Sequence, residues 1–392
     1  MAGPVRIFIS AGEASGDLYG ALLIEALRAR LGEADFWGCG GDRMRAAGCR
    51  TLVDAHQIAM VGLVEVVPGL ARAWRAFRRL VAALPAERPA LAILIDFPDF
   101  NLRLAKKLKR RGVPVLYFVA PQVWAWRRWR LRTIRKYVDR LLCIFPFEEA
   151  FFRNAGVAAE FVGHPLAGRV APSLTAQEFR SRNGLPEDRP MIALLPGSRE
   201  KEILLNLPPM LETAKQLAAQ GPCNFVLPAA STTNGAWIRR QVASSGVTVA
   251  VLENCTYDAV AHARAAIVAS GTAAVETALL GTPMVIVYRV SDATWRLGRW
   301  MVRTPFYSMV NLVAERLIVP EFIQDQFQPQ AVARAVRELM ENPDAEKRMR
   351  EELKEVAARL SRGPENTGPQ SEDAIQRAAA IAQSMISGRV AR

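Results

Sequence analysis

Short, continuous apolar runs alternate along the chain with longer stretches in which apolar residues recur every three or four positions. In the first half, the apolar runs predict strands at residues 5–10, 34–38, 91–97, 113–119, 140–145 and 160–163. The stretches between them, such as 101–111 and 148–155, predict amphipathic helices. Because strands that are apolar at every position have both faces covered, this pattern predicts a parallel sheet between two helical layers.

The same alternation restarts after a polar, turn-rich connector at residues 170–190, which contains SRNGLPEDRP. The second set of apolar runs predicts strands at residues 191–195, 224–228, 247–252, 266–269 and 283–288. We therefore predict an α/β fold of two Rossmann-like domains, residues 1–170 and 171–370, whose parallel sheets face a central cleft. A helical segment at 371–392, beyond a break at RGPENTGPQ, is expected to pack back on the first domain.

The first predicted strand is followed by AGEASGD, residues 11–17. In open α/β sheets, ligands bind beyond the carboxyl ends of the strands, so this loop is a candidate site. Its spacing lacks the G-x-G-x-x-G of a dinucleotide fingerprint. Asp17 either caps the following helix or belongs to the site, whereas Glu13 comes too early to cap and is expected to be functional.

A second loop with carboxylates, IDFPDFN, follows another apolar run at residues 95–101. Asp96 stands at the strand end, where a carboxylate in apolar surroundings suits a general base that deprotonates a hydroxyl. The alternative is an aspartate that only stabilises the turn. Asp99 or Asn101 could cap the next helix.

Two loops of the second half favour an anion. LPGSREKE, residues 195–202, opens a helix with exposed backbone N–H groups and an arginine, which suits a pyrophosphate. VASGTAAVE, residues 268–276, opens another, and its glutamate can reach a pair of ribose hydroxyls. The alternatives are an exposed capping loop and a surface glutamate. The candidate residues are Gly197, Ser198, Arg199, Ser270, Gly271, Thr272 and Glu276.

Two segments combine arginines with large apolar residues. VAPQVWAWRRWRLRTIRKY, residues 119–137, fits a nucleic-acid surface, a membrane interface, or a helix whose tryptophans pack inward. MVGLVEVVPGLARAWRAFRRL, residues 60–80, fits either a helix on a bilayer surface or a buried helix with its arginines in water. The net charge of +13 favours an anionic partner without choosing among these.

The remaining composition narrows the class of protein. The five cysteines are scattered with no CxxC pair and there are three histidines, so we expect no metal site. No apolar run reaches the roughly 18 residues of a spanning helix, and the first residues enter a strand pattern directly, which predicts a cytoplasmic protein. His164, at the last strand of the first half, fits a hinge or a structural histidine.

The motifs AGEASGD, IDFPDFN, PQVWAWR, FPFE, VGHP, LPGSR, SGTAAVE and MVNLVAER occur in this order, and with them nearly the whole chain resembles the lipid-A-disaccharide synthase family. The resemblance implies a GT-B glycosyltransferase, a hexosyltransferase of lipid A biosynthesis that needs no cofactor. It implies inverting transfer from UDP-2,3-diacylglucosamine to 2,3-diacylglucosamine 1-phosphate (lipid X), which gives the lipid A disaccharide 1-phosphate and UDP. It also implies a peripheral position on the inner face of the inner membrane, in contact with anionic lipid, and is compatible with a homodimer.

The resemblance also assigns roles to residues. It implies that Asp96 and Glu13 are catalytic and adds Asn311 to the UDP-binding set of residues 197–199, 270–272 and 276. It implies an apolar membrane-facing patch, made of Val64, Val66, Val67, Leu70 and Trp74. The alternatives are another GT-B enzyme of UDP-sugars, such as a peptidoglycan-precursor transferase or an epimerase, and a nucleic-acid-binding protein. The last lacks any RNP, helix-turn-helix or zinc pattern.

Overall fold

The computed structural model describes residues 4–59, 66–230, 233–298, 304–361 and 373–390. The chain forms two compact units. Unit 1 consists of Met1–Pro165 together with Ser361–Arg392, and unit 2 of Leu166–Leu360.

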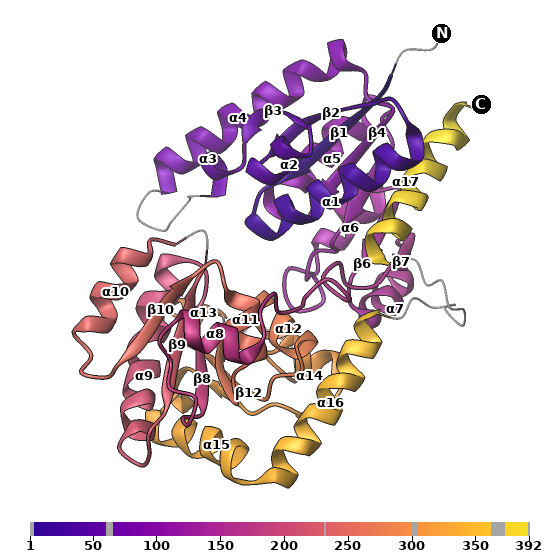
Figure 1. The fold of residues 1–392 in the computed structure, drawn as a ribbon. Helices are drawn as coiled ribbons and strands as arrows, with labels where there is room; N and C mark the ends of the chain where they lie inside the picture. Colours follow the sequence, from indigo (N-terminus) through magenta and orange to yellow (C-terminus); the bar gives the residue numbers. More distant parts are fainter. Residues whose placement is uncertain (1–3, 60–65, 231–232, 299–303, 362–372, 391–392) are drawn as a thin grey trace. The chain divides into compact units, whose positions relative to one another are not determined.

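Unit 1 contains a parallel sheet of seven strands in the order β3-β2-β1-β4-β5-β6-β7 (Figure 1). Its strands are β1 (Val5–Ala11), β2 (Ala34–Gly40), β3 (Arg50–Asp54), β4 (Leu91–Ile95), β5 (Val115–Phe118), β6 (Arg140–Cys143) and β7 (Ala159–Phe161). The order reverses between β1 and β4, which pair directly with Ala11 opposite Ile95. Such a reversal is where open α/β sheets bind their ligands.

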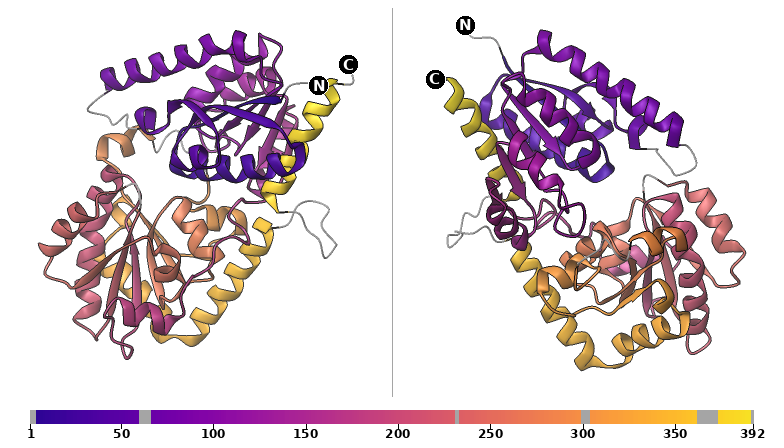
Figure 2. Two further views of the ribbon diagram at one scale, coloured as in Figure 1. Left: turned by 45° about the horizontal axis from the view of Figure 1, so that its top comes forward. Right: turned by 180° about the vertical axis from the view of Figure 1, so that it is seen from behind.

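Helices cover both faces of this sheet. The helices of unit 1 are α1 (Ala14–Leu31), α2 (Asp42–Ala46), α3 (His56–Ala59), α4 (Val66–Glu87), α5 (Pro98–Lys109), α6 (Arg130–Tyr137), α7 (Pro146–Asn154) and α17 (Ala374–Val390). Helix α17 lies against α1 in every view (Figure 2), and Gln383 donates to the carbonyl of Arg30. On the other face, Phe8, Trp37 and Leu94 share one buried cluster with residues of α4, α5 and α6.

Unit 2 repeats this plan with a parallel sheet of six strands in the order β10-β9-β8-β11-β12-β13. Its strands are β8 (Met191–Leu195), β9 (Asn224–Ala229), β10 (Val249–Glu253), β11 (Ala265–Ala269), β12 (Met284–Tyr288) and β13 (Glu321–Ile323). Its helices are α8 (Ala176–Arg182), α9 (Glu200–Ala218), α10 (Gly235–Ala243), α11 (Thr256–Ala261), α12 (Thr272–Leu279), α13 (Asp292–Gly298), α14 (Met309–Ala314), α15 (Pro329–Glu341) and α16 (Pro343–Ser361), with a 3-10 turn at Gln324–Gln326. Here the order reverses between β8 and β11, which pair with Leu195 opposite Val268.

The eleven strands predicted from apolar runs are all present, with ends that differ by a few residues. Two edge strands, β3 and β13, were not predicted. Strand β3 carries polar residues at both ends, and β13 is only three residues long, so neither has the apolar run of a central strand. Among the described residues, no helix has the length and apolarity needed to cross a bilayer.

Candidate active site

The loops after β1 and β4 carry Glu13 and Asp96 and lie side by side. The two strands are paired up to Ala11 and Ile95, so each carboxylate follows its strand within two residues of that pair. Gly12 packs so closely on Phe97 that a Cβ there would come within 2.3 Å of the phenyl ring. Unit 1 thus places the backbone positions of Glu13 and Asp96 on neighbouring loops, as the sequence predicts.

The turn that carries Asp96 has an unusual backbone. Asp96 and Phe97 are both left-handed, with φ of 45° and 50°. Non-glycine residues in this region are strained and concentrate at functional sites. Three donors hold the turn in place: Tyr117 Oη donates to the Asp96 carbonyl at 2.6 Å, Asn101 Nδ2 donates to it at 2.8 Å, and the Asp96 N–H bonds to Phe118 O at 3.0 Å.

Asn101 does not cap α5, contrary to one of the alternatives above. The N-cap position is Phe97, without a side-chain cap, and Asn101 is fully buried. Its Nδ2 also donates to the carbonyls of Ser10 (3.3 Å) and Ile95 (3.1 Å), and its Oδ1 accepts the Ser10 hydroxyl at 2.8 Å. Asn101 therefore fastens the end of β1 to the end of β4.

Asp99 does not cap α5 either. Its carboxylate pairs with Arg127, in the segment between β5 and α6, at 3.0 Å, and with Arg130, the first residue of α6.

Asp17 caps a helix, but not its own. It is buried in the first turn of α1, and its carboxylate accepts the backbone N–H groups of Gly41 (2.6 Å), Arg43 (3.0 Å) and Met44 (3.2 Å) at the start of α2. The N-cap of α1 is Glu13, with no side-chain capping bond. Glu13 therefore stands at the capping position itself, contrary to the expectation that it comes too early to cap.

Glu148 is a buried carboxyl that sequence reasoning missed, although it ends the FPFE motif. Trp124 Nε1 donates to it at 3.0 Å and the Phe145 N–H at 3.3 Å. Burial raises the pKa of Glu148 to about 8, against the lowering effect of these donors. The bond fixes Trp124, so that this tryptophan of the WAWR segment packs inward while Trp126 and Trp129 are exposed.

His164 is a packing residue. Its ring lies 5.6 Å from that of Phe145 and 6.4 Å from that of Tyr19, and burial lowers its pKa to about 3, so it is neutral at physiological pH.

Unit 2 places its two predicted anion loops on the paired strands β8 and β11. The first, residues 197–199, leads into α9, and its Arg199 is the N-cap with a side chain that is 62% exposed. In this structure Glu202 meets both groups expected to bind an anion: it accepts the Ser198 N–H at 3.4 Å and pairs with Arg199 at 3.3 Å. Glu202 thus engages the N–H and guanidinium groups that the sequence assigns to an anion.

The second loop begins α12. Gly271 is its N-cap with φ 155°, and Ser270 donates its hydroxyl to Tyr307 O at 2.9 Å. Glu276 accepts the hydroxyl of Tyr257 at 3.2 Å, and burial raises the pKa of Glu276 while that hydrogen bond lowers it. Glu276 is thus a partly enclosed hydrogen-bond acceptor about one turn into the helix.

Asn311 is buried and its amide is engaged within the protein. Nδ2 donates to Val319 O (2.9 Å) and to Glu321 (2.8 Å), while Oδ1 accepts the N–H groups of Ile318 and Val319. Glu321 in turn accepts the N–H groups of Tyr307 and Ser308, each at 2.9 Å. Asn311 therefore supports the loop of Ser270 through Glu321 and Tyr307, and its contact with UDP stays a prediction.

Asn206 has the same function in unit 2 that Asn101 has in unit 1. It is fully buried in α9, donates to the carbonyls of Glu202 (2.9 Å) and Pro196 (3.3 Å), and accepts the Arg289 N–H at 2.8 Å. The sequence signal was an asparagine within the apolar stretch ILLNLPPML.

The predicted membrane-facing residues fall largely where side chains are not described. Val64 lies outside the described residues, and Val66, Val67 and Leu70 belong to α4, for which only the backbone is described there. Trp74 is 58% exposed, and the Arg78 guanidinium lies 4.6 Å from its ring centroid.

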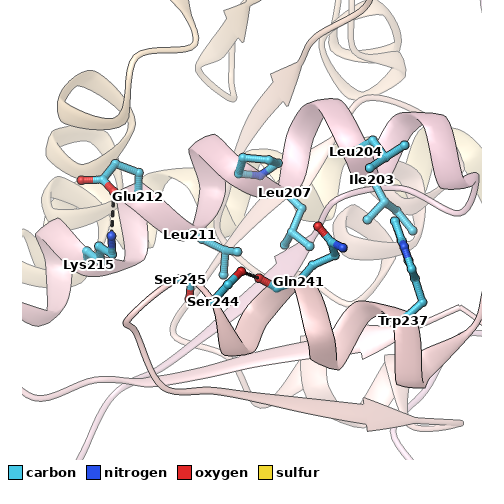
Figure 3. Close-up of a pocket in the computed structure, with 11 residues that line it drawn as sticks. Ile203, Leu204, Leu207, Leu211, Glu212, Lys215, Trp237, Gln241, Ser244 and Ser245 are labelled. Atoms are coloured by element: carbon cyan, nitrogen blue, oxygen red, sulfur yellow. Dashed lines mark hydrogen bonds and ion pairs between the residues drawn. The ribbon is translucent and has the colours of Figure 1, made fainter.

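A groove of about 220 Å³ runs between α9 and α10 (Figure 3). Leu204, Leu207 and Trp237 line its apolar part, and the Glu212–Lys215 ion pair lies toward one end. The groove lies between helix flanks, and none of the predicted site residues lines it.

The family model and the related sequences agree on one family. The family model for lipid-A-disaccharide synthetase matches residues 7–370. The lipid-A-disaccharide synthase of Solibacter usitatus is 47% identical over 91% of this chain and 93% of its own length. That of Myxococcus xanthus is 46% identical over 92% and 94%.

Solved structures resemble the fold. The UDP-GlcNAc 2-epimerase of Neisseria meningitidis, bound to UDP-GlcNAc, has a TM-score of 0.63 at 11% identity and covers 98% of this chain and 100% of its own. A calicheamicin glycosyltransferase has a TM-score of 0.59 at 17% identity and covers 100% of both chains. At such low identity the likeness shows the fold alone, which is the predicted GT-B fold with two Rossmann-like units.

Proposed function

The chain belongs to the lipid-A-disaccharide synthetase family, and from that premise we propose that it is an inverting glycosyltransferase of lipid A biosynthesis. It joins UDP-2,3-diacylglucosamine to 2,3-diacylglucosamine 1-phosphate (lipid X) and gives the β-1,6-linked lipid A disaccharide 1-phosphate and UDP. The observation that carries the proposal is the pairing of β1 with β4, which sets Glu13 and Asp96 side by side at the reversal of the sheet.

Unit 1 supplies the acceptor chemistry in this proposal. Asp96 is the general base that takes the proton of the acceptor 6-hydroxyl, and the resulting alkoxide attacks C1 of the donor sugar from the side opposite UDP. Glu13 accepts a hydrogen bond from a sugar hydroxyl and orients it toward Asp96. The left-handed turn, held by Tyr117 and Asn101, keeps the base fixed, which lowers the cost of reaching the reactive geometry.

Unit 2 supplies the donor chemistry. The negative charge that develops on the departing diphosphate is stabilised by two helix N-termini, at residues 197–199 and 271–272, and by the guanidinium of Arg199. Glu276 accepts the ribose hydroxyls of the nucleotide. Glu202, which now engages Ser198 and Arg199, moves aside when the diphosphate binds.

The reaction itself is the first test. Purified protein is incubated with UDP-2,3-diacylglucosamine and 2,3-diacylglucosamine 1-phosphate, and the products are identified by mass spectrometry. The proposal requires a disaccharide phosphate and an equal amount of UDP. UDP-sugar conversion without an acceptor would instead indicate an epimerase, and absence of both products would refute the proposal.

The Asp96→Asn variant tests the base. It should abolish transfer while UDP binding, measured by calorimetry, persists, since Asn cannot accept the proton. Asp35→Asn is the matched control, because Asp35 lies near the amino end of β2, whereas the site lies at the carboxyl ends of the strands. Near-normal turnover of Asp96→Asn would remove Asp96 as the base.

The Arg199→Ala variant tests the clamp. It should weaken UDP binding, whereas Arg240→Ala, which removes an exposed arginine of α10, should not. Equal UDP affinities for wild type and Arg199→Ala would exclude Arg199 from the diphosphate site.

Lipid substrates require the enzyme to work at a bilayer, so we place it in the cytoplasm, peripheral on the inner face of the inner membrane. The exposed Trp74 with Arg78 beside it suits the boundary between headgroups and acyl chains. Trp74→Ala should reduce sedimentation with vesicles that contain anionic lipid, and unchanged sedimentation would contradict this role. A homodimer also stays a prediction, which light scattering would test by measuring the molar mass in solution.

A further inference from the structure

Two arginines of the WAWRRWR segment converge on one carboxylate. Arg127 Nη1 lies 3.1 Å and 3.0 Å from the two oxygens of Asp99, and Arg130 Nη2 bonds to Asp99 Oδ1. The side chains of Arg127 and Arg130 are only 29% and 12% exposed, whereas that of Asp99 is 67% exposed. Both guanidiniums are therefore largely enclosed and held in place by one carboxylate, which is the most exposed group of the cluster.

The cluster has a surplus of positive charge. Two guanidiniums face one carboxylate, and the contacts with Asp99 use one nitrogen of each, whereas an arginine carries five N–H donors in a planar fork. Arg127 also has a left-handed backbone, with φ 57°. An ion pair at a surface contributes too little to account for such a strained residue, which points to a functional constraint.

The cluster lies beside the proposed base. Asp99 is three residues from Asp96 at the start of α5. The hydroxyl of Tyr117 donates to Asp96 O. Burial raises the pKa of Tyr117, the charge of Asp96 raises it further, Arg130 lowers it and Asp99 raises it, so the charges of the cluster and of the proposed base act on the same phenol.

We propose that Arg127 and Arg130 form the binding subsite for the phosphate monoester of the lipid acceptor. The inference rests on the proposed function, which supplies an acceptor with one phosphate and two acyl chains. A phosphate monoester matches the planar forks of two arginines, and its negative charge balances the net positive charge of Arg127, Arg130 and Asp99 together. The exposed rings of Trp126 (40%) and Trp129 (63%) beside it suit acyl chains.

The subsite is tested by comparing two acceptors, 2,3-diacylglucosamine 1-phosphate and 2,3-diacylglucosamine with a free 1-hydroxyl, in detergent micelles without phospholipid. Arg127→Gln should lower kcat/KM for the phosphorylated acceptor about 10- to 100-fold, the effect of one lost charge-assisted hydrogen bond. It should change kcat/KM for the hydroxyl acceptor and KM for the donor little. Arg127→Lys, which keeps the charge but not the fork, should fall between.

Arg128→Gln is the matched control, because it removes the same charge one residue away and its guanidinium lies 5.8 Å from the centroid of the Phe151 ring rather than at Asp99. The proposal is overturned if Arg127→Gln lowers kcat/KM equally for both acceptors, or if Arg128→Gln has the same effect. It is also overturned if Arg127→Gln reduces only sedimentation with anionic vesicles, since the arginine would then bind bilayer headgroups.

A second measurement separates this inference from the proposed function. If the wild type transferred sugar to neither acceptor, the proposed function would fail. Direct calorimetric binding of the two acceptors would still show whether Arg127 recognises the phosphate. A wild type that binds both acceptors with equal affinity would exclude the subsite.

Discussion

Replacing Asn101 tests how the site is held together, because one side chain fastens β1, β4 and the turn of Asp96. Asn101→Ala removes the hydrogen bonds to Asp96 O (2.8 Å), Ile95 O (3.1 Å) and Ser10 O (3.3 Å) and the bond accepted from the Ser10 hydroxyl (2.8 Å). Each such bond contributes about 1 kcal/mol net, and buried carbonyls lose a donor, so the free energy of unfolding should fall by about 2–4 kcal/mol. Since a displacement of about 1 Å can cost about 100-fold in rate, kcat should fall about 10- to 100-fold.

The control is Asn224→Ala in unit 2, which removes another buried asparagine, bonded to Pro186 O at 2.7 Å, at the amino end of β9. Both variants are compared by urea unfolding and by kcat at a temperature where each is folded. Asn101→Ala should lose kcat well beyond the loss in Asn224→Ala. Equal kcat in the two variants would refute the idea that Asn101 positions Asp96.

Three further predictions concern other contacts of the site. Gly12→Ala places a Cβ 2.3 Å from the Phe97 ring, so it should lower the free energy of unfolding by about 1–3 kcal/mol and greatly reduce kcat. Gly221→Ala is the control, because a Cβ there would have no atom within 4 Å, and it should change neither quantity. Urea unfolding and initial rates measure the two effects. Burial raises the pKa of Glu276, so its carboxylate becomes protonated at a higher pH than usual, and KM for the donor should rise as pH falls. Glu276→Gln should flatten this dependence of KM on pH. A dependence of unchanged shape in the variant would argue against ribose binding by Glu276. Burial raises the pKa of Glu148 from 4.5 to about 8, so the folded state holds the proton more tightly than the unfolded state, and this contribution to stability is complete below pH 4.5 and lost as pH rises to 8. The stability of Glu148→Gln relative to wild type should therefore increase across this window in urea titrations, and a constant difference would contradict the buried neutral carboxyl.

The central strands and their carboxyl-end loops could be predicted because burial on both faces leaves a continuous apolar run. That pattern located Glu13, Asp96, Arg199 and Ser270 at strand ends. The edge strands escaped because an edge needs no such run: β3 begins and ends with Arg50 and Asp54, and β13 begins with Glu321.

The partners of the polar side chains could not be predicted, because they depend on tertiary contacts. Asp17, Asn101 and Asn311 all read as capping or ligand residues. In the structure Asp17 caps the distant helix α2, Asn101 joins two strands, and Asn311 supports Glu321. Short polar side chains bond to whichever backbone groups the fold brings near, and no local pattern encodes that choice.

The packing of α17 on α1 has a consequence for biosynthesis. Because α17 begins at Ala374 and its partner surface was made near the start of translation, the ribosome must complete the whole of unit 2 before unit 1 can close. Until α17 is made, the surface of α1 that it covers is exposed to solvent. The folded yield of this protein should therefore depend more on chaperones than that of a protein whose domains fold one after another during synthesis.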